Sequence, residues 1–211
     1  MILGILGFKG GVGKTTAAVH LAGFLNESAP TCLIDCDPNQ SALAWARKGR
    51  LPFPVVSEEE TARVARKYHH LVIDAKARPT RETLAAVLRG SDFLILPTTP
   101  DSLAIDALLQ TVEALGGLAR DRFRILLNIC PPYPSTEPEQ ARALLMKAGF
   151  PLFLGQIRRS VAFQRAPLVG GLVQDTGEER AGLCAADYAG IGTELLDLMK
   201  GEDDGKEKNH S

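Results

Sequence analysis

The segment KGGVGKTT, residues 9–16, decides the fold of this chain. It follows a short apolar run, Ile2–Leu6, and leads into a stretch of helical period, so it joins a buried strand to a helix. Glycines let backbone N–H groups approach phosphate oxygens closely, and the first turn of the following helix adds a partial positive charge. Gly-Lys-Thr in this context is the signature of a P-loop. The segment therefore predicts a site for the phosphates of a nucleoside triphosphate.

Each residue of this loop has an expected role. Lys14 would neutralise the β- and γ-phosphates, and the Thr15 hydroxyl would bind Mg²⁺. The predicted nucleotide-binding residues of the loop are Gly10, Gly11, Val12, Gly13, Lys14, Thr15 and Thr16. The usual first glycine of the motif is replaced by Phe8, and a second lysine, Lys9, follows it. A second cation at the loop entrance can stabilise phosphate charge beyond what Lys14 supplies.

Outside the loop, short apolar runs alternate with longer stretches of helical period. This alternation predicts an α/β fold with a mostly parallel sheet flanked by helices. The expected strands are Ile2–Leu6, Cys32–Ile34, Leu71–Ile73, Phe93–Leu96, Ile125–Asn128 and Leu152–Gln156. The expected helices are Lys14–Asn26, Gln40–Lys48, Glu58–Tyr68, Arg81–Arg89, Ser102–Leu115, Pro138–Ala148 and Ala181–Met199. Thr80 and Asp101 are expected N-caps.

Length and composition indicate one soluble domain. The chain has 211 residues, 45% hydrophobic and 23% charged, with a net charge of −1. We expect a single P-loop domain over residues 1–199 and a disordered charged tail over 200–211, which has no apolar side chain to bury. The four cysteines lack CxxC spacing and are expected to be reduced thiols. The N-terminus has no basic leader, and no apolar run reaches the ~20 residues that span a bilayer, so we expect a cytoplasmic protein without membrane contact.

Charge is distributed unevenly along the chain. Between Gly117 and Gly170 there are eight Lys or Arg residues against three acids, whereas from Asp175 onward acids outnumber bases ten to four. A basic segment in a neutral protein can attract a polyanion, although a solvated charged face is the alternative interpretation.

Further motifs complete a resemblance that covers residues 1 to about 175. The deviant P-loop of residues 9–16 resembles the Walker A motif of the ParA/MinD family of ATPases, and within it the short partition ATPases that lack an N-terminal DNA-binding domain. LIDCDPNQS, residues 33–41, resembles the second-strand motif of the family. The resemblance implies that Asp37 positions the attacking water and that Asp35 lies near the water shell of Mg²⁺. A carboxylate at the end of a parallel strand projects into the crevice where ligands bind.

Two later strand ends extend the resemblance. LVID, residues 71–74, resembles a Walker B strand, which implies that Asp74 holds Mg²⁺ through water. The family usually continues Asp-Thr-Pro, whereas this chain continues AKARP over residues 75–79, a departure that bears on hydrolysis rather than on nucleotide binding. LLN, residues 126–128, resembles the strand whose asparagine contacts adenine, a role that falls on Asn128. No guanine-binding signature follows, which favours ATP over GTP.

The resemblance also implies how the site is used. Lys9 would reach the nucleotide of a second copy, so that ATP drives formation of a homodimer that binds non-specific DNA. The segment IRRSV, residues 157–161, aligns with a family stretch that contains a DNA-contacting arginine. The predicted DNA-binding residues are Arg158, Arg159 and Arg165. A partner protein would stimulate slow hydrolysis, and the dimer would position a plasmid, a chromosome region or a protein assembly over the nucleoid.

Other proteins that share this phosphate loop set the alternatives. A metabolic ligase of the dethiobiotin-synthetase or cobyrinate-amidase type is the main one. A MinD-like membrane regulator would end in a basic amphipathic helix, an iron–sulfur carrier would need a cysteine pair, and a tyrosine kinase would need a C-terminal tyrosine cluster. The chain shows none of these three sequence features.

Overall fold

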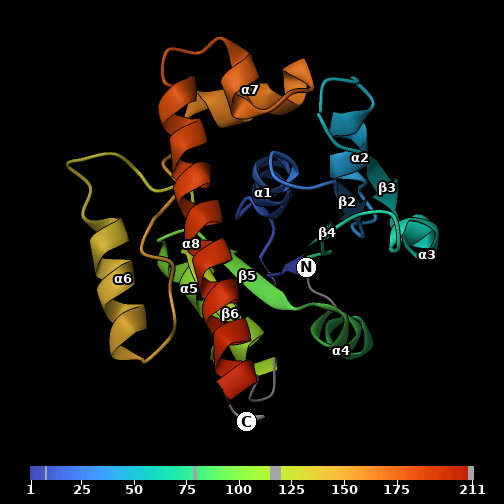
Figure 1. Ribbon diagram of the computed structural model, residues 1–211. Helices are drawn as coiled ribbons and strands as arrows, with labels where there is room; N and C mark the ends of the chain where they lie inside the picture. Colours follow the sequence, from blue (N-terminus) through green and yellow to red (C-terminus); the bar gives the residue numbers. More distant parts are fainter. Residues whose placement is uncertain (8, 78–79, 115–119, 209–211) are drawn as a thin grey trace.

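The computed structural model describes residues 1–7, 9–77, 80–114 and 120–208. Its centre is a six-stranded, entirely parallel sheet in the order β3-β2-β4-β1-β5-β6. The strands are β1 Ile2–Ile5, β2 Thr31–Asp35, β3 Val55–Ser57, β4 His70–Asp74, β5 Phe93–Thr98 and β6 Phe123–Leu127. The predicted fold class is confirmed, and the P-loop strand β1 lies in the middle of the sheet (Figure 1).

Helices connect the strands and cover both faces of the sheet. They are α1 Lys14–Asn26, α2 Ser41–Ala46, α3 Thr61–Val64, α4 Arg81–Gly90, α5 Ser102–Ala114, α6 Glu137–Lys147, α7 Val161–Val169 and α8 Ala181–Lys208, with 3₁₀ turns at Glu58–Glu60 and Val173–Thr176. Asp101 caps α5, since its Oδ1 accepts the Ala104 N–H at 3.0 Å, as expected. The predicted helix end at Leu115 lies outside the described residues.

Alternating strand residues bury two separate apolar layers. Phe93 and Ile95 of β5 pack with α1, α2 and α8, whereas Leu94 and Leu96 pack with α4, α5 and α6 on the opposite face. Side chains alternate between the two faces of a strand, so a continuous apolar run suits a strand that is covered on both sides. In Figure 1, α1 lies between α8 and α2, and α7 lies across the upper end of α8.

The predicted strand Leu152–Gln156 is wrong. This segment makes an isolated bridge between Leu152 and Ile125 of β6, and the ladder ends there because Arg142 binds the Phe153 carbonyl, which a longer ladder would pair with β6. The Phe153 N–H donates to the Ile125 carbonyl at 3.0 Å, but its own carbonyl accepts from Arg142 at 2.7 Å instead of from β6. On the side away from β6, both carboxylate oxygens of Glu194 accept the Leu154 N–H, at 2.9 and 3.0 Å. The segment therefore runs beside β6 without joining the sheet.

Other boundaries also differ from those expected. The helix predicted over Glu58–Tyr68 is a 3₁₀ turn and the short α3. The structure adds three elements that were not predicted: β3, α7 and the 3₁₀ turn Val173–Thr176. Helix α8 continues to Lys208, past the predicted end at Met199, where a disordered tail was expected. Residues 209–211 lie outside the described part of the chain. No helix in the described ranges is both long and apolar enough to cross a membrane.

The topology gathers the predicted nucleotide-binding, catalytic and metal-binding residues at one edge of the sheet. In a parallel sheet the carboxyl ends of the strands lie together, and the loops that follow them form the ligand crevice. The P-loop follows β1, Asp37 follows β2 and Asn128 follows β6. Asp35 and Asp74 are the last residues of β2 and β4, and they are paired across those adjacent strands.

Candidate nucleotide-binding site

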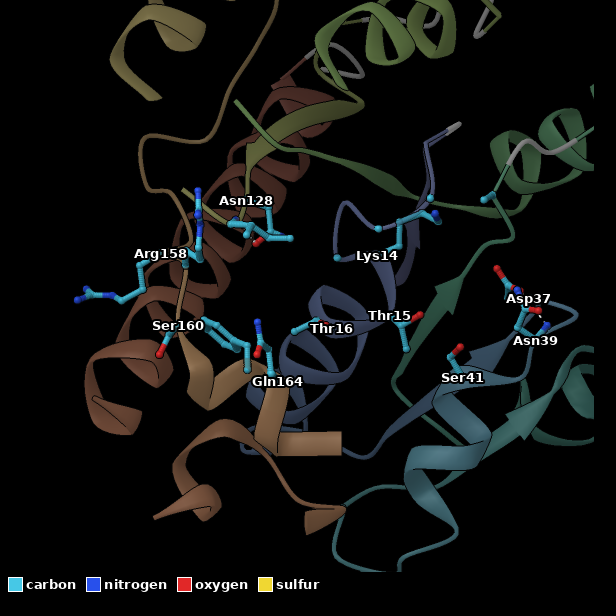
Figure 2. Close-up of a pocket in the computed structure, with 17 residues that line it drawn as sticks. Lys14, Thr15, Thr16, Asp37, Asn39, Ser41, Asn128, Arg158, Ser160 and Gln164 are labelled. Atoms are coloured by element: carbon cyan, nitrogen blue, oxygen red, sulfur yellow. Dashed lines mark hydrogen bonds between the residues drawn. The ribbon is translucent and has the colours of Figure 1, made fainter. Parts of the chain in front are cut away.

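A cleft of about 470 Å³ opens over the P-loop at the carboxyl edge of the sheet. Its lining residues are Gly10, Gly11, Gly13, Lys14, Thr15, Thr16, Asp37, Asn39, Ser41, Ala77, Asn128, Ile129, Arg158, Arg159, Ser160, Phe163 and Gln164. Figure 2 shows Asp37, Asn39 and Ser41 on one side of the P-loop and Asn128, Arg158, Ser160 and Gln164 on the other. The cleft thus has a floor of loop backbone between two walls. We call the side that contains Asp37 the first wall and the side that contains Asn128 the second wall.

The P-loop backbone depends on two glycines in the left-handed region. Gly11 has φ +79° and Gly13 has φ +86°, a conformation that costs an L-residue roughly 1–2 kcal/mol. Gly13 precedes α1, and its carbonyl accepts the Ala17 N–H at 2.9 Å, which starts the helix. The first N–H groups of α1 have no partner within the helix and lie at the floor of the cleft. Such groups bind anions, so this floor suits phosphates.

Lys14 is a buried cation inside the loop. Its side chain is 7% exposed, and its Nζ donates to the Lys9 carbonyl at 3.3 Å. Burial lowers the pKa of Lys14, while the nearby Asp74 and Asp37 carboxylates oppose that shift. A buried ammonium group is stabilised by an anion placed against it, which is what a phosphate would supply.

Asp74 gives the site an unsatisfied carboxylate. It is 1% exposed, and neither of its oxygens accepts a hydrogen bond from the described residues. Burial raises its pKa to about 7, while Thr15 and Lys14 act in the opposite direction. A buried carboxylate without donors, beside the P-loop threonine, fits a divalent cation. The described ranges contain no cluster of three or more His, Cys, Asp or Glu that could hold a metal alone. The remaining ligands of Mg²⁺ would therefore be phosphate oxygens and water.

Asp35 is held by backbone donors, in contrast to Asp74. Its Oδ1 accepts the Asp37 N–H at 3.1 Å, and its Oδ2 accepts the Leu43 N–H at 3.0 Å. These contacts fix the turn that carries Asp37 into the cleft and the start of α2. In the structure, Asp35 thus positions the turn that carries Asp37. Its predicted place near the Mg²⁺ water shell stays a prediction.

Asp37 lies on the wall of the cleft beside the P-loop. Its Oδ1 accepts the Asn39 N–H at 2.9 Å, and its carbonyl accepts the Gln40 N–H at 2.8 Å. This turn holds the Asp37 side chain at the cleft rather than against the protein surface (Figure 2). A carboxylate in that place could accept a proton from, or orient, a water molecule near the γ-phosphate.

Asn128 braces the P-loop from the opposite wall. Its Nδ2 donates to the Val12 carbonyl at 2.9 Å, its Oδ1 accepts the Ile129 N–H at 2.9 Å, and the residue is 2% exposed. A Cβ added at Gly13 would lie 2.4 Å from the Asn128 Nδ2. The structure therefore gives Asn128 a role in holding the loop, and the adenine contact stays a prediction.

Lys9 points to the edge of the loop rather than into the floor. Its Nζ donates to Asp101 Oδ1 at 2.9 Å, and the two side chains are 34% and 48% exposed. Burial would raise the pKa of Asp101, but hydrogen bonds from Thr99, Lys9 and the Ala104 N–H outweigh it and lower that pKa to about 2. A solvent-exposed ion pair of this kind contributes roughly 0–1 kcal/mol, so a stronger anion could replace Asp101.

The three predicted DNA-binding arginines have different surroundings. Arg158 binds both oxygens of Asp187, each at 2.7 Å, and Arg165 pairs with Glu178 at 2.9 Å. Arg159 is exposed at the cleft and makes no ion pair with the residues that the structure describes. Of these three arginines, Arg159 alone has a guanidinium group that makes no ion pair with the described residues.

The sequence-based prediction missed several residues of the second wall. Ser160 accepts the Ala162 N–H at 3.2 Å and caps α7, so that Phe163 and Gln164 of its first turns line the cleft. A serine that precedes an apolar segment is a recognisable N-cap signal. Ile129 has φ +55°, an unusual conformation for a β-branched residue, which no sequence pattern indicated.

Comparison with known proteins gives a consistent result. Residues 3–173 match the family described as the CobQ/CobB/MinD/ParA nucleotide binding domain. The chain is 34% identical over 201 residues to "Maintenance of carboxysome distribution protein A" of Gloeobacter kilaueensis, covering 92% of this chain and 93% of that protein.

Solved structures share the fold. An ATP complex of Cyanothece McdA superposes with a TM-score of 0.72 at 16% identity, covering 92% of this chain and 95% of that one. The Mg-ADP complex of the septum site-determining protein MinD from Pyrococcus horikoshii gives a TM-score of 0.67 at 21% identity, covering 94% and 96%.

Proposed function

The chain belongs to the CobQ/CobB/MinD/ParA nucleotide-binding family, and from that premise we propose that it is an ATPase that positions a cargo by an ATP-gated cycle of dimerisation and DNA binding. The observation that carries the proposal is that Lys14, Thr15 and Asp37 line one cleft and that the buried Asp74 carboxylate lies beside the first two of them. These residues supply a buried cation, a hydroxyl, an unsatisfied carboxylate and a wall carboxylate, which are the groups that phosphoryl transfer to water requires.

The catalytic part of the proposal assigns one role to each group. Lys14 and the loop N–H groups hold the phosphates, and Asp37 orients a water molecule for in-line attack on the γ-phosphate. Asp74 and Thr15 hold Mg²⁺, Asp74 through water, and the metal would neutralise charge on the phosphates. Asp35 acts on this step through the turn that it fixes around Asp37.

The dimer part of the proposal depends on Lys9. Its ammonium group lies at the rim of the loop in an exposed pair with Asp101, so it is available to a second copy of the chain. The phosphates of the nucleotide bound to that copy carry more negative charge than one carboxylate and would replace Asp101. ATP would then stabilise a homodimer, because each Lys9 contacts the nucleotide bound by the other copy.

The DNA part of the proposal depends chiefly on Arg159. Its unpaired guanidinium group suits a phosphate of the DNA backbone, and contacts of this kind bind without sequence preference. Arg158 and Arg165 would contribute less, since each already pairs with a carboxylate. Such contacts would place the ATP-bound dimer on the nucleoid.

The nature of the cargo rests on the relatives. The protein from Gloeobacter kilaueensis is named for carboxysome distribution, and this chain covers 93% of its length. We therefore favour a protein assembly of the carboxysome kind as the cargo, with a partner protein on that assembly stimulating hydrolysis. A metabolic ligase remains the alternative from the same family, and it would hydrolyse ATP only together with its own substrate.

The test measures mass and hydrolysis together. Light scattering would follow the mass of the protein with ATP, with ADP and without nucleotide, and phosphate release would be measured in parallel. We expect a dimer only with ATP, loss of that dimer in Lys9→Ala, and an ATP-bound dimer that hydrolyses poorly in Asp37→Ala. Lys147→Ala, on an exposed face of α6, is the matched control and should behave like the unchanged protein. A protein that stays monomeric with ATP would exclude the proposed cycle.

A further inference from the structure

Four ring-bearing side chains from four helices meet behind the cleft: His20 of α1, Trp45 of α2, Phe163 of α7 and Tyr188 of α8. We name these four residues the aromatic cluster. His20 stacks on Tyr188 with ring centroids 4.9 Å apart, and it meets Phe163 and Trp45 edge-to-face at 5.4 and 5.9 Å. Because His20 contacts all three other rings, it is the centre of the cluster.

Two hydrogen bonds fix the ring of His20. Its Nδ1 lies 2.7 Å from the Thr16 carbonyl, and its Nε2 lies 3.0 Å from the backbone nitrogen of Val173. A carbonyl can only accept and a backbone N–H can only donate, so Nδ1 carries the proton and the ring is neutral. Burial agrees with this assignment, since it lowers the pKa of His20 to about 4.

Each end of this arrangement reaches the nucleotide cleft. Thr16 belongs to the P-loop floor, and Phe163 belongs to the second wall, so His20 joins floor and wall from behind. The 3₁₀ turn that contains Val173 follows α7, and the His20–Val173 bond therefore fixes how α7 lies against α1 (Figure 1).

The first wall, which contains Asp37, is also connected to the aromatic cluster, through Trp45. The Trp45 indole N–H donates to the Gly171 carbonyl at 3.0 Å, and Lys48 Nζ donates to the Leu168 carbonyl at 2.6 Å. Helix α2, which begins shortly after Asp37, is thus bonded to the loop that follows α7, and the turn after α2 is bonded to the end of α7. The floor and both walls of the cleft share the aromatic cluster as their common support.

We propose that His20 is a positioning residue for the nucleotide: it holds the α7 wall at the distance from the P-loop at which ATP binds. His20 is 5% exposed and lies behind the cleft, so it acts through Thr16 and Phe163 rather than by touching the ligand. The inference rests on the proposed nucleotide site and adds to it the residue that fixes its width.

Substitutions at His20 can separate its two hydrogen bonds. Gln places an amide near the Nε2 position and can still accept from Val173, whereas Asn places it near Nδ1 and can still donate to Thr16. Phe keeps the ring and loses both bonds. Leu145→Ala is the control for a loss of stability alone, since Leu145 is 1% exposed in the other apolar layer, on α6.

The experiment measures binding of a fluorescent ATP analogue with Mg²⁺, together with the melting temperature and the hydrolysis rate. For His20→Phe we expect a dissociation constant raised about tenfold (about 1.4 kcal/mol) and a similar rise in KM, with kcat within about twofold. His20→Gln should bind within about threefold of the unchanged protein, and His20→Asn at least about threefold more weakly than His20→Gln. Leu145→Ala should melt earlier yet bind within about twofold.

Two outcomes would overturn the inference. One is binding by His20→Phe within twofold of the unchanged protein. The other is binding of the analogue that is weakened by the same factor in Leu145→Ala, because the effect of His20→Phe would then follow from lower stability alone. If His20→Phe does not fold, the order of His20→Gln and His20→Asn decides, and equal or reversed affinities would reject the role of the Val173 bond. Absence of analogue binding to the unchanged protein would instead remove the proposed nucleotide site itself.

Discussion

Replacement of Gly13 by alanine perturbs the P-loop in two ways that can be separated. The residue has φ +86°, and a new Cβ would lie 2.4 Å from the Asn128 Nδ2. The left-handed conformation costs an alanine roughly 1–2 kcal/mol. Displacement of Asn128 would break its bond to the buried Val12 carbonyl, which costs roughly 1–3 kcal/mol. Together these effects predict that Gly13→Ala loses about 2–5 kcal/mol of unfolding free energy.

The neighbouring glycines supply matched controls. Gly11 has φ +79° but open space around a new Cβ, so Gly11→Ala should lose only the roughly 1–2 kcal/mol of conformational strain. Gly10 has no left-handed φ, and a Cβ added there would have no neighbour within 4 Å. Gly10→Ala should therefore have nearly the same unfolding free energy as the unchanged protein. Urea unfolding without nucleotide, followed by the emission of the single tryptophan, Trp45, gives all three values.

A double-mutant cycle isolates the clash. If the Gly13 Cβ meets the Asn128 amide, removal of that amide should relieve the strain. Gly13→Ala combined with Asn128→Ala should then lose about 1–3 kcal/mol less than the sum of the two single changes, because both single changes break the Asn128–Val12 bond. Equal unfolding midpoints for Gly13→Ala and Gly11→Ala, or strict additivity in the cycle, would refute the reasoning about Asn128.

Three further predictions concern single side chains. Asp37→Ala should bind ATP normally but lower phosphate release at least about tenfold, measured under single-turnover conditions; an unchanged rate would remove its catalytic role. Arg159→Ala should weaken binding to non-specific DNA and flatten its salt dependence, whereas Arg165→Ala, already paired with Glu178, should have the smaller effect; the reverse order would contradict the assignment. His20 has a pKa of about 4 in the folded protein against 6.5 for the free group, so folding favours the neutral ring and stability falls as the pH decreases from 6.5 to 4. Across that interval the unfolding free energy of the unchanged protein, measured with urea, should fall by up to about 3 kcal/mol more than that of His20→Phe. Parallel pH profiles for the two proteins would exclude the lowered pKa of His20.

The sequence predicted the parts of the site that lie close together along the chain. The P-loop of residues 9–16 predicted its strand and helix, because the motif itself determines the local conformation. The carboxylates at Asp35, Asp37 and Asp74 were placed at the correct edge because parallel strands end together. Burial on both faces of the sheet followed from continuous apolar runs.

Contacts between distant residues were not predictable in this way. Lys9 and Asp101 are 92 positions apart, and Asn128 and Val12 are 116 apart, so no local pattern could pair them. Helix α7 escaped prediction because Pro167 lies inside it, where proline usually ends a helix.

Side-chain competition for a backbone group explains the difference at Leu152. The apolar run there resembled a strand, but Arg142 binds the Phe153 carbonyl, which a ladder with β6 would use. For Asp35 the structure adds hydrogen bonds from two backbone N–H groups, and its predicted place near Mg²⁺ stays a prediction. A carboxylate motif identifies the edge of the sheet, whereas the backbone N–H groups around each carboxylate decide which of its oxygens stays free.

The most direct test of the central proposal measures binding to non-specific duplex DNA with ATP, with ADP and without nucleotide. Lys9→Ala would be measured beside the unchanged protein, and Lys147→Ala would serve as the charge-matched control. We expect tight, salt-sensitive binding with ATP only, lost in Lys9→Ala and retained in Lys147→Ala. Absence of DNA binding in every nucleotide state, or equal binding with ATP and ADP, would contradict the proposal.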